Sequence, residues 1–409
     1  MKNLFKFLRG GVVLLLAHLF VLPVFLLSQE LKIIPYYSLG VVEGAFIPNK
    51  GDWNFSVNLL SDLGVMVKPS EIHSFIGFYE LKYTGPGLKR QEGEKFTDRT
   101  MDHLVSLRHN FLISDSYFLK SQINYMKEYK RTGSNEPWGT GLYDFDRMGG
   151  MISVGRKFSD LTVLSLTGQY HTMKFPNYTD LLAEFQAGSG SAESSAGKQN
   201  HNIIQAGVSL DVDTNKLAFD IILMNYTKQH IAEATLSAGS YYGSDLQKDI
   251  IYNVSARRIQ KVGETFTIAP EVAYKVKSSN QNYLHFESFG STTPPVYFDD
   301  YYSYNEFAFF VPAAIALSKR FEFSVTPEWD YKLYKNRNPR NTDGVFLTNE
   351  KQSNNMFILD TGLCFKPNDV TRTTLFYVFQ NQKSNMKYER YLPYNYTGNY
   401  MGIKFEYTF

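Results

Sequence analysis

Apolar and polar residues alternate with a period of two along much of the chain. In Phe321–Leu333, aromatic and aliphatic residues fill every second position, and charged or hydroxyl residues fill most positions between them. The same alternation is found in three further segments: Phe266–Lys277, Tyr117–Glu128 and Met401–Phe409. It is weaker in Leu161–Phe175 and Phe307–Leu317, where both faces carry apolar residues. This period predicts β-strands with one apolar and one polar face.

Three prolines fall inside predicted strands: Pro270, Pro312 and Pro327. Proline has no amide hydrogen to donate to a neighbouring strand, so it is disfavoured in the interior of a sheet. We therefore expect a bulge at each of them.

The predicted strands are joined by two alternating kinds of connection. Short polar turns recur at Lys68–Ser70, Ser114–Asp115, Ser159–Asp160, Asp213–Asn215, Lys261–Gly263, Lys319–Arg320 and Lys366–Asp369. Long connections rich in Gly, Ser, Asn, Pro and Tyr lie between them, at Gly85–Arg99, Arg131–Asp144, Pro176–Asn200, Ile231–Gln247, Ser278–Tyr301, Lys335–Lys351 and Ser384–Gly398. Short turns on one side and long loops on the other are typical of outer-membrane barrels.

The turns set the number of strands. Seven short turns make seven hairpins, and an opening strand near Tyr36–Ile47 and a closing strand ending at Phe409 bring the total to sixteen. The predicted fold is all-β: a single antiparallel transmembrane barrel of about 16 strands, with short periplasmic turns and long extracellular loops. The alternative is a soluble β-sandwich or propeller. The predicted strands of roughly 11–14 residues are longer than the five or six usual in soluble sheets.

The first residues have the pattern of a secretory signal. Lys2, Lys6 and Arg9 precede an apolar run, Val12–Leu27, and we expect cleavage near Ser28–Gln29. The run of about 16 residues is shorter than the roughly 20 that span a bilayer as a helix, so an uncleaved anchor is the less favoured alternative. The expected organisation is a signal peptide over residues 1–29 and one barrel over residues 30–409.

Composition narrows the class of protein further. Aromatic residues make up 16% of the chain, and those near predicted strand ends fit the girdles at membrane surfaces: Tyr36, Tyr37, Tyr129, Phe158 and Phe365. A formal charge of +2 gives no electrostatic argument for a nucleic-acid partner. The single cysteine, Cys364, excludes a disulfide framework and a multi-cysteine metal site.

The last ten residues, Tyr400 to Phe409, alternate aromatic or aliphatic with polar positions and end in phenylalanine. This segment resembles the closing strand of Gram-negative outer-membrane proteins. The resemblance implies an outer-membrane location, contact with membrane lipid and lipopolysaccharide, and reading of the strand ending in Phe409 by the barrel-assembly machinery. The chain resembles a porin, without a plug or periplasmic domain, and is also similar to the larger barrels that export polysaccharide.

The polar face of the predicted strands carries the candidate pore-lining residues. They are Lys120, Glu128, Asp220, Glu271, Lys275, Glu322, Glu328, Asp330, Lys332, Arg372, Lys404 and Glu406. Charged residues in a lumen set ion and solute preference. Because both signs occur in similar number, we expect a transverse field that favours polar neutral solutes such as sugars. The alternative is that these charges pair across strands and fill the lumen.

Catalysis, cofactors and metals are not expected. A phospholipase-type site would need a serine and a histidine on neighbouring strands, and the available histidines are read as girdle or loop residues: His73, His103, His109, His171, His201, His230 and His285. His103 and His109 share one face of a predicted strand but lie roughly 20 Å apart, too far for one metal ion. Asp299 and Asp300 match no calcium-loop spacing.

The connection Pro176–Asn200 contains a short predicted helix. Thr179 or Asp180 can cap it, and Leu181, Leu182 and Phe185 form an apolar stripe. The helix fits a constriction inside the lumen, and it fits a place on the outer loops better.

The sequence therefore predicts an outer-membrane channel for passive or facilitated diffusion of small polar solutes, assembled as a homotrimer. Two alternatives stay open. One is an export barrel for a surface polysaccharide, and the other is a non-conducting barrel with a structural or adhesive role.

Overall fold

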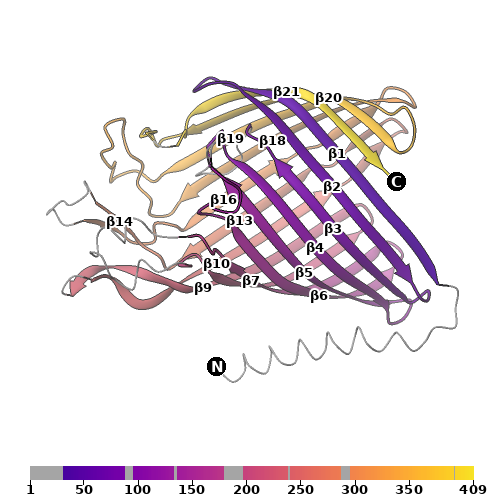
Figure 1. The fold of residues 1–409 in the computed structure, drawn as a ribbon, viewed down its shortest axis with the longest axis horizontal. Coiled ribbons are helices and arrows are strands. Elements are labelled where there is room, and N and C mark those ends of the chain that lie inside the picture. Colours follow the sequence, from indigo (N-terminus) through magenta and orange to yellow (C-terminus); the bar gives the residue numbers. More distant parts are fainter. Residues whose placement is uncertain are drawn as a thin grey trace.

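The polypeptide closes into one antiparallel β-barrel of sixteen strands (Figure 1). The computed structural model describes residues 31–87, 95–132, 136–178, 197–237, 240–286, 295–390 and 392–409. The predicted signal peptide over residues 1–29 and the predicted helix after Tyr178 lie outside these ranges. Within the described residues no helix is long and apolar enough to cross a membrane. The fold class expected from the sequence is confirmed.

The first ten strands follow one another around the barrel, each paired with the next. They are β1 (Lys32–Pro48), β2 (Asn54–Lys68), β3 (His73–Thr84), β4 (Arg99–Leu112), β5 (Tyr117–Arg131), β6 (Phe145–Ser159), β7 (Thr162–Lys174), β8 (His201–Val212), β9 (Asn215–Ser237) and β10 (Ser240–Arg258).

The other strands complete the circle, some of them in two pieces. β11 (Gln260–Val262) continues β10 in the same register. The remaining six strands are β12 (Phe266–Ile268) with β13 (Glu271–Ser279), β16 (Tyr304–Phe310) with β17 (Ala313–Ala316), β18 (Phe321–Tyr334), β19 (Ser353–Phe365), β20 (Thr371–Ser384) and β21 (Tyr396–Thr408). β21 pairs with β1 and closes the barrel. A separate small hairpin, β14 (Tyr283–His285) and β15 (Val296–Phe298), lies in the connection between β13 and β16.

Two of the three prolines interrupt their strands, but the expected bulges are absent there, because the pairing keeps the same register on both sides of each break. Pro270 stands between β12 and β13, and Pro312 stands between β16 and β17. The bulge expected at Pro327 is absent, because β18 runs through this residue without interruption. The Pro327 carbonyl accepts a hydrogen bond of 3.0 Å from the Val311 amide, beside the break in the neighbouring strand. In an antiparallel sheet, the amide and the carbonyl of one residue point to the same neighbouring strand. The amide hydrogen that Pro327 lacks would therefore have pointed to the break between β16 and β17.

Short turns gather at one end of the barrel, where the C-terminus lies, and longer connections gather at the other, where β14 lies (Figure 1). We call these the short-turn end and the loop end. One predicted long connection, Ile231–Gln247, is wrong, because β9 runs to Ser237 and β10 starts again at Ser240. The register shifts three times between Ser240 and Lys248, which interrupts the period of two that would have indicated strands. The opening strand also begins earlier than predicted, at Lys32.

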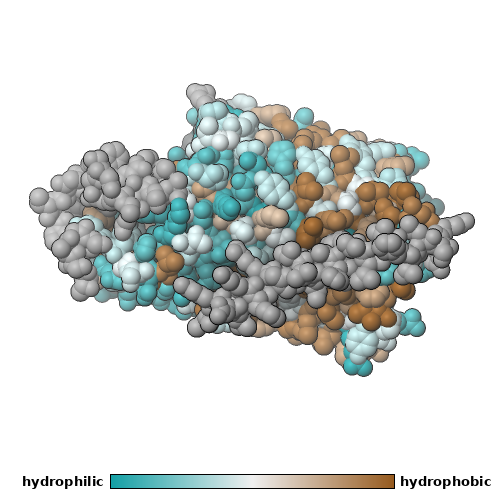
Figure 2. Space-filling view, turned by 60° about the horizontal axis from the view of Figure 1, so that its bottom comes forward, coloured by the Kyte–Doolittle hydropathy of each residue, from teal (hydrophilic) through white to brown (hydrophobic). Residues whose placement is uncertain are grey.

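Directly opposed residues on neighbouring antiparallel strands share a face, so the registers trace an outer and an inner wall around the barrel. The outer wall carries large exposed apolar side chains such as Leu63, Leu166 and Ile403. Figure 2 shows apolar residues gathered toward the short-turn end, with a hydrophilic surface toward the loop end. This belt fits the hydrocarbon layer of a membrane.

Four aromatic side chains on the outer wall donate hydrogen bonds to a polar residue on the next strand. The pairs are Tyr125–Asp146 (2.7 Å), Tyr170–Asn202 (3.2 Å), Trp329–Asn355 (2.9 Å) and Tyr377–Asn399 (2.6 Å). In each pair the acceptor lies two positions nearer the loop end than the residue opposite the ring. Rings with one apolar body and one polar edge prefer the membrane surface. The repeated pair therefore fits a membrane boundary on the loop side.

The predicted girdle residues fall on both walls. Tyr37, Tyr129 and Phe365 lie on the outer wall by register, and Phe158 lies beside the outer-wall residue Arg156. Tyr36 is an exception, because it is opposite Gly64 on the inner wall.

One sector of the inner wall near the loop end is packed with apolar side chains. Phe46, Met356, Ile358, Val378 and Tyr400 form a buried cluster contributed by β1, β19, β20 and β21. Phe96, from the connection between β3 and β4, packs against this cluster. Its ring lies 5.1 Å from that of Phe46 and 4.9 Å from that of Tyr396. This sector, which we call the Phe46 cluster, is therefore closed to water.

Candidate functional site: the lumen and its loop-end cap

The strand registers place all the sequence-predicted candidate residues on the inner wall. Lys120 and Glu128 lie there on β5, Asp220 on β9, Glu271 and Lys275 on β13, and Arg372 on β20. Glu322, Glu328, Asp330 and Lys332 lie there on β18, and Lys404 and Glu406 on β21. The alternation of polar and apolar residues thus predicts which wall each residue lies on. It does not predict which of these side chains contact one another.

A ladder of charges crosses three strands of this wall. Glu306 on β16 lies opposite both Lys275 on β13 and Lys332 on β18. Its carboxylate oxygens are 2.6 Å from the Lys275 Nζ and 3.0 Å from the Lys332 Nζ. Sequence reasoning missed Glu306, because alternation is weak in the segment Phe307–Leu317 that follows it. Both flanking lysines therefore satisfy one half-buried carboxylate.

Other predicted residues are also held by near neighbours. Lys404 and Glu406 are 2.7 Å apart, and Glu322 is 2.7 Å from Lys366. Asp220 accepts a hydrogen bond of 3.2 Å from Gln205. For these residues the structure fits the alternative in which inward-facing polar residues pair with one another.

Basic side chains at the short-turn end are solvent-exposed. They include the predicted residues Lys120 and Arg372 and four that sequence reasoning missed: Arg108, Lys157, Lys216 and Arg257. All lie on the inner wall by register. Their positions near strand ends gave no signal that distinguished them from ordinary turn residues.

A cluster of carboxylates lies farther toward the loop end of the same wall. Asp62 is opposite Glu80, and Asp102 is opposite Glu128. Only Glu128 was predicted. The strand His73–Thr84 carries apolar residues on both faces, so its polar positions did not stand out. Lys82, opposite Asp102, adds a basic group to this cluster.

Near the loop end the inner polar groups are buried and hydrogen-bonded to one another. The buried Asp249 carboxylate is 2.8 Å from the Lys277 Nζ and accepts hydrogen bonds from Ser279 (2.6 Å) and Gln247 (3.1 Å). The Gln281 side chain donates to Gln247 at 3.3 Å. The polar groups of this part of the inner wall are therefore satisfied by the protein's own side chains.

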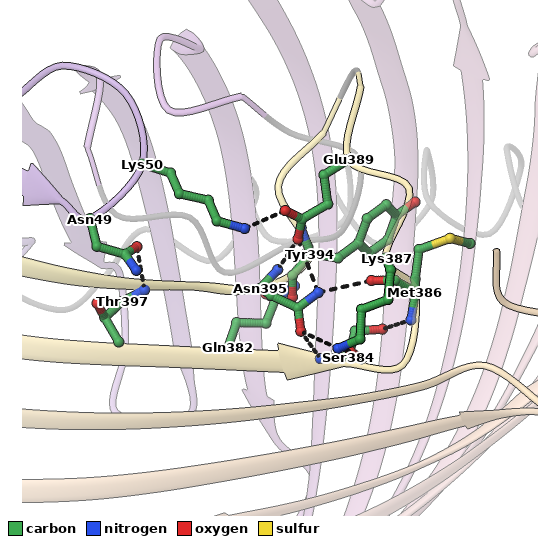
Figure 3. Close-up of polar contacts among 10 residues, drawn as sticks. All are labelled: Asn49, Lys50, Gln382, Ser384, Met386, Lys387, Glu389, Tyr394, Asn395 and Thr397. Atoms are coloured by element: carbon green, nitrogen blue, oxygen red, sulfur yellow. Dashed lines mark hydrogen bonds and ion pairs between the residues drawn. The ribbon is translucent and has the colours of Figure 1, made fainter. Parts of the chain in front are cut away.

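The connection between β1 and β2 is tied to the connection between β20 and β21 (Figure 3). Lys50 pairs with Glu389, whose other carboxylate oxygen accepts hydrogen bonds from the Tyr394 amide (2.9 Å) and the Asn395 side chain (3.0 Å). Burial opposes ionisation of Glu389, but the bonds from Lys50, Asn395 and Tyr394 outweigh it and lower the pKa of this carboxyl. Asn49 and Thr397 are joined by backbone and side-chain bonds of 2.9 and 2.8 Å.

Aromatic and guanidinium groups complete this cap at the loop end. The Arg337 guanidinium lies over the Tyr301 and Tyr334 rings, at 5.0 and 4.7 Å. The Arg340 guanidinium lies over the Phe346 ring at 4.3 Å and over the Tyr388 ring at 5.6 Å. The loop tyrosines thus stack within the protein. We use the name loop-end cap for the described residues of three connections: 280–286 with 295–303, 335–352, and 385–390 with 392–395.

Five of the described histidines bond to another histidine, to a tyrosine or to a backbone carbonyl. His73 and His109 meet on the outer wall with ring nitrogens 3.0 Å apart, and His103 bonds to the Tyr79 hydroxyl at 2.9 Å. His201 and His230 bond to the carbonyls of Gln199 and Gly243. In the described part of the chain no group of three or more His, Cys, Asp or Glu is placed to hold a metal ion.

No protein-family model and no curated protein matches the chain in sequence. Solved structures with a similar course of the chain are outer-membrane barrels. OmpT, an outer membrane protein of Vibrio cholerae, has a TM-score of 0.46 at 9% identity, over 93% of this chain and 98% of that one. A bacterial polysaccharide outer membrane secretin has 0.44 at 10%, over 92% and 98%. An anion-selective porin from Comamonas acidovorans has 0.43 at 10%, over 93% and 100%. Likenesses this distant carry no conclusion about activity.

Proposed function

We propose that the barrel lies in the outer membrane of a Gram-negative-type bacterium and passes small polar solutes through its lumen. The observation that supports this most is the inner wall at the short-turn end, where Lys120, Arg372 and their basic neighbours are exposed to solvent. Sixteen-stranded barrels are wide enough to hold an aqueous channel. Charged side chains in such a channel select among solutes. The passage is passive and contains no catalytic step.

The cap makes this passage a gated one. Buried polar groups around Asp249 and the Phe46 cluster fill the loop end, and the link between Lys50 and Glu389 holds two connections together. Solutes therefore cross when the loop-end cap moves. Gating by a few surface contacts is consistent with motions of loops on the microsecond scale and slower.

The inner wall bears on the two alternatives. An export barrel for polysaccharide is expected to carry a dense lining of one charge sign, whereas this wall carries both. A structural barrel is expected to be closed by paired charges and large side chains. The Glu306 ladder and the Phe46 cluster are features of that kind, but the basic side chains at the short-turn end remain exposed.

Conductance of the refolded protein in a planar bilayer tests the proposal. We expect stable current steps in KCl that neutral sugars reduce up to a size limit. A folded barrel without any current, even after removal of the Lys50–Glu389 link, would contradict a passage and favour the structural barrel. The oligomeric state in detergent separately checks the expected homotrimer.

A further inference from the structure

Three basic side chains on neighbouring strands form an unneutralised stretch of the inner wall. Arg108 lies on β4, Lys120 on β5 and Lys157 on β6, all near the short-turn end and all exposed. Arg108 donates to the Gln122 side chain at 3.1 and 2.9 Å, and the Lys120 Nζ lies 4.9 Å from the Phe118 ring centre. None of the three has a carboxylate within ion-pair distance in the described part of the chain. We call this stretch the basic wall.

The residues directly opposite the basic wall are uncharged, and they include the apolar Ile76 beside Arg108 and Val163 beside Lys157. Asn110 and Ser153 flank Lys120 on the neighbouring strands. Asn110 donates to Ser74 at 3.1 Å, and Thr167 donates to Ser153 at 3.0 Å. Ammonium and guanidinium groups beside amides and hydroxyls offer donors to an anion, and no carboxylate lies directly opposite any of the three basic residues.

The acidic residues of the same strands lie too far away to cancel this charge. Asp102 precedes Arg108 by six positions on β4, and Glu128 follows Lys120 by eight on β5. At about 3.3 Å per residue these separations are roughly 20 and 26 Å. The Debye length at physiological ionic strength is only about 8 Å. On β4 and β5 positive and negative charge are therefore separated along the axis, with the basic wall nearer the short-turn end. The nearest inner-wall carboxylate on the other side is Asp211 on β8, two strands away from Lys157.

We propose that the basic wall binds small anions, carboxylates or phosphates, that enter the lumen from the short-turn end. This assigns a charge to the solutes of the proposed passage, in place of the neutral solutes expected from the even count of charges. Binding itself does not require that the anion then crosses. A failure of the passage and a failure of the anion site are therefore separate results.

Equilibrium binding of inorganic tripolyphosphate to the refolded barrel in detergent, measured by titration calorimetry at low ionic strength, tests the site. The test variant combines Arg108→Gln, Lys120→Gln and Lys157→Gln. The control variant combines Arg258→Gln, Lys319→Gln and Arg320→Gln, which removes the same charge from exposed residues at the same end of the barrel, one on the outer wall and two in the turn between β17 and β18. Gel mobility with and without heating shows that each variant folds.

We expect tripolyphosphate to bind the test variant about tenfold more weakly than the unchanged protein, because up to three charge contacts are lost. The control variant should bind within about twofold of the unchanged protein. Equal weakening in both variants, or none in the test variant, would overturn the site. A test variant that fails to fold is replaced by Lys120→Gln and Lys120→Arg, of which only the first should weaken binding. Binding without bilayer current would leave the anion site standing and contradict the passage.

Discussion

The two ends of the lumen are built from the same strands, but their inward polar groups are satisfied in different ways. At the loop end Asp249, Ser279 and Gln281 are buried and bond to one another. At the short-turn end Lys120 and Arg372 face solvent. The difference comes from the connections, since long loops lie at one end of the barrel and turns of two to five residues lie at the other. Alternation along a strand decides which residues face inward, and the connections decide whether water reaches them.

Among the changes that test the difference between the two ends, replacing Phe46 with alanine should have the largest effect. Its side chain is fully buried in the packed sector, so its loss leaves a cavity and should lower the free energy of unfolding by about 3–5 kcal/mol. Urea unfolding in lipid vesicles, followed by tryptophan fluorescence, measures the change. Phe405→Ala on the lipid-facing wall is the control and should cost less, because that side chain is 39% exposed. Equal costs would show that the sector is not packed.

Replacing Glu306 with glutamine should have the next largest effect. The change leaves Lys275 and Lys332 without the carboxylate they share. It should lower the free energy of unfolding by about 1.5–3 kcal/mol. The same unfolding assay applies, with Glu264→Gln in an exposed turn as the control. Removing both lysines together with Glu306 should recover part of the loss. If Glu306→Gln alone were neutral, the ladder would be a surface pair without energetic weight.

Removing the Lys50–Glu389 link should loosen the loop-end cap. Because Lys50 is partly exposed, we expect the link to stabilise the closed cap by about 1 kcal/mol or less. Channel openings in the bilayer should therefore be up to about fivefold more frequent in Glu389→Gln. The Glu389 pKa is lowered in the folded protein, so its contribution is present above the ordinary value of 4.5 and is lost as the pH falls through the lowered pKa. The unchanged protein should open more at acid pH, and Glu389→Gln should lack this step. A step that persists in the variant would assign the response to other groups.

Replacing Asp146 with asparagine should have the smallest effect. Its ion pair with Lys127 spans 3.6 Å on the outer wall near the loop end, where both side chains are about a third exposed. The expected change in unfolding free energy is about 0–1 kcal/mol. Bilayer current should not change, and a change would mean that the outer wall affects the cap.

Much of the barrel follows from the sequence because a barrel needs only local signals. Alternation in Phe321–Leu333 defines β18, and the polar turns fix the number of strands. The β9–β10 extension was missed because bulges between Ser240 and Lys248 interrupt the period. Partners across strands, such as Glu306 with Lys275 and Lys332, were missed because register depends on pairing rather than on periodicity. The Phe46 cluster depends on Phe96 folding back from a connection, which no strand pattern indicates.

The difference between the two ends is tested most directly by the rate at which a small polar thiol reagent modifies single cysteines in the refolded barrel. Cys364→Ser removes the native thiol. Lys120→Cys then reports on the inner wall at the short-turn end, and Ser303→Cys reports on the buried loop end. We predict fast modification at position 120 and protection at position 303 until the barrel is unfolded. Equal rates, or faster modification at position 303, would contradict a lumen that is open at the short-turn end and capped at the loop end.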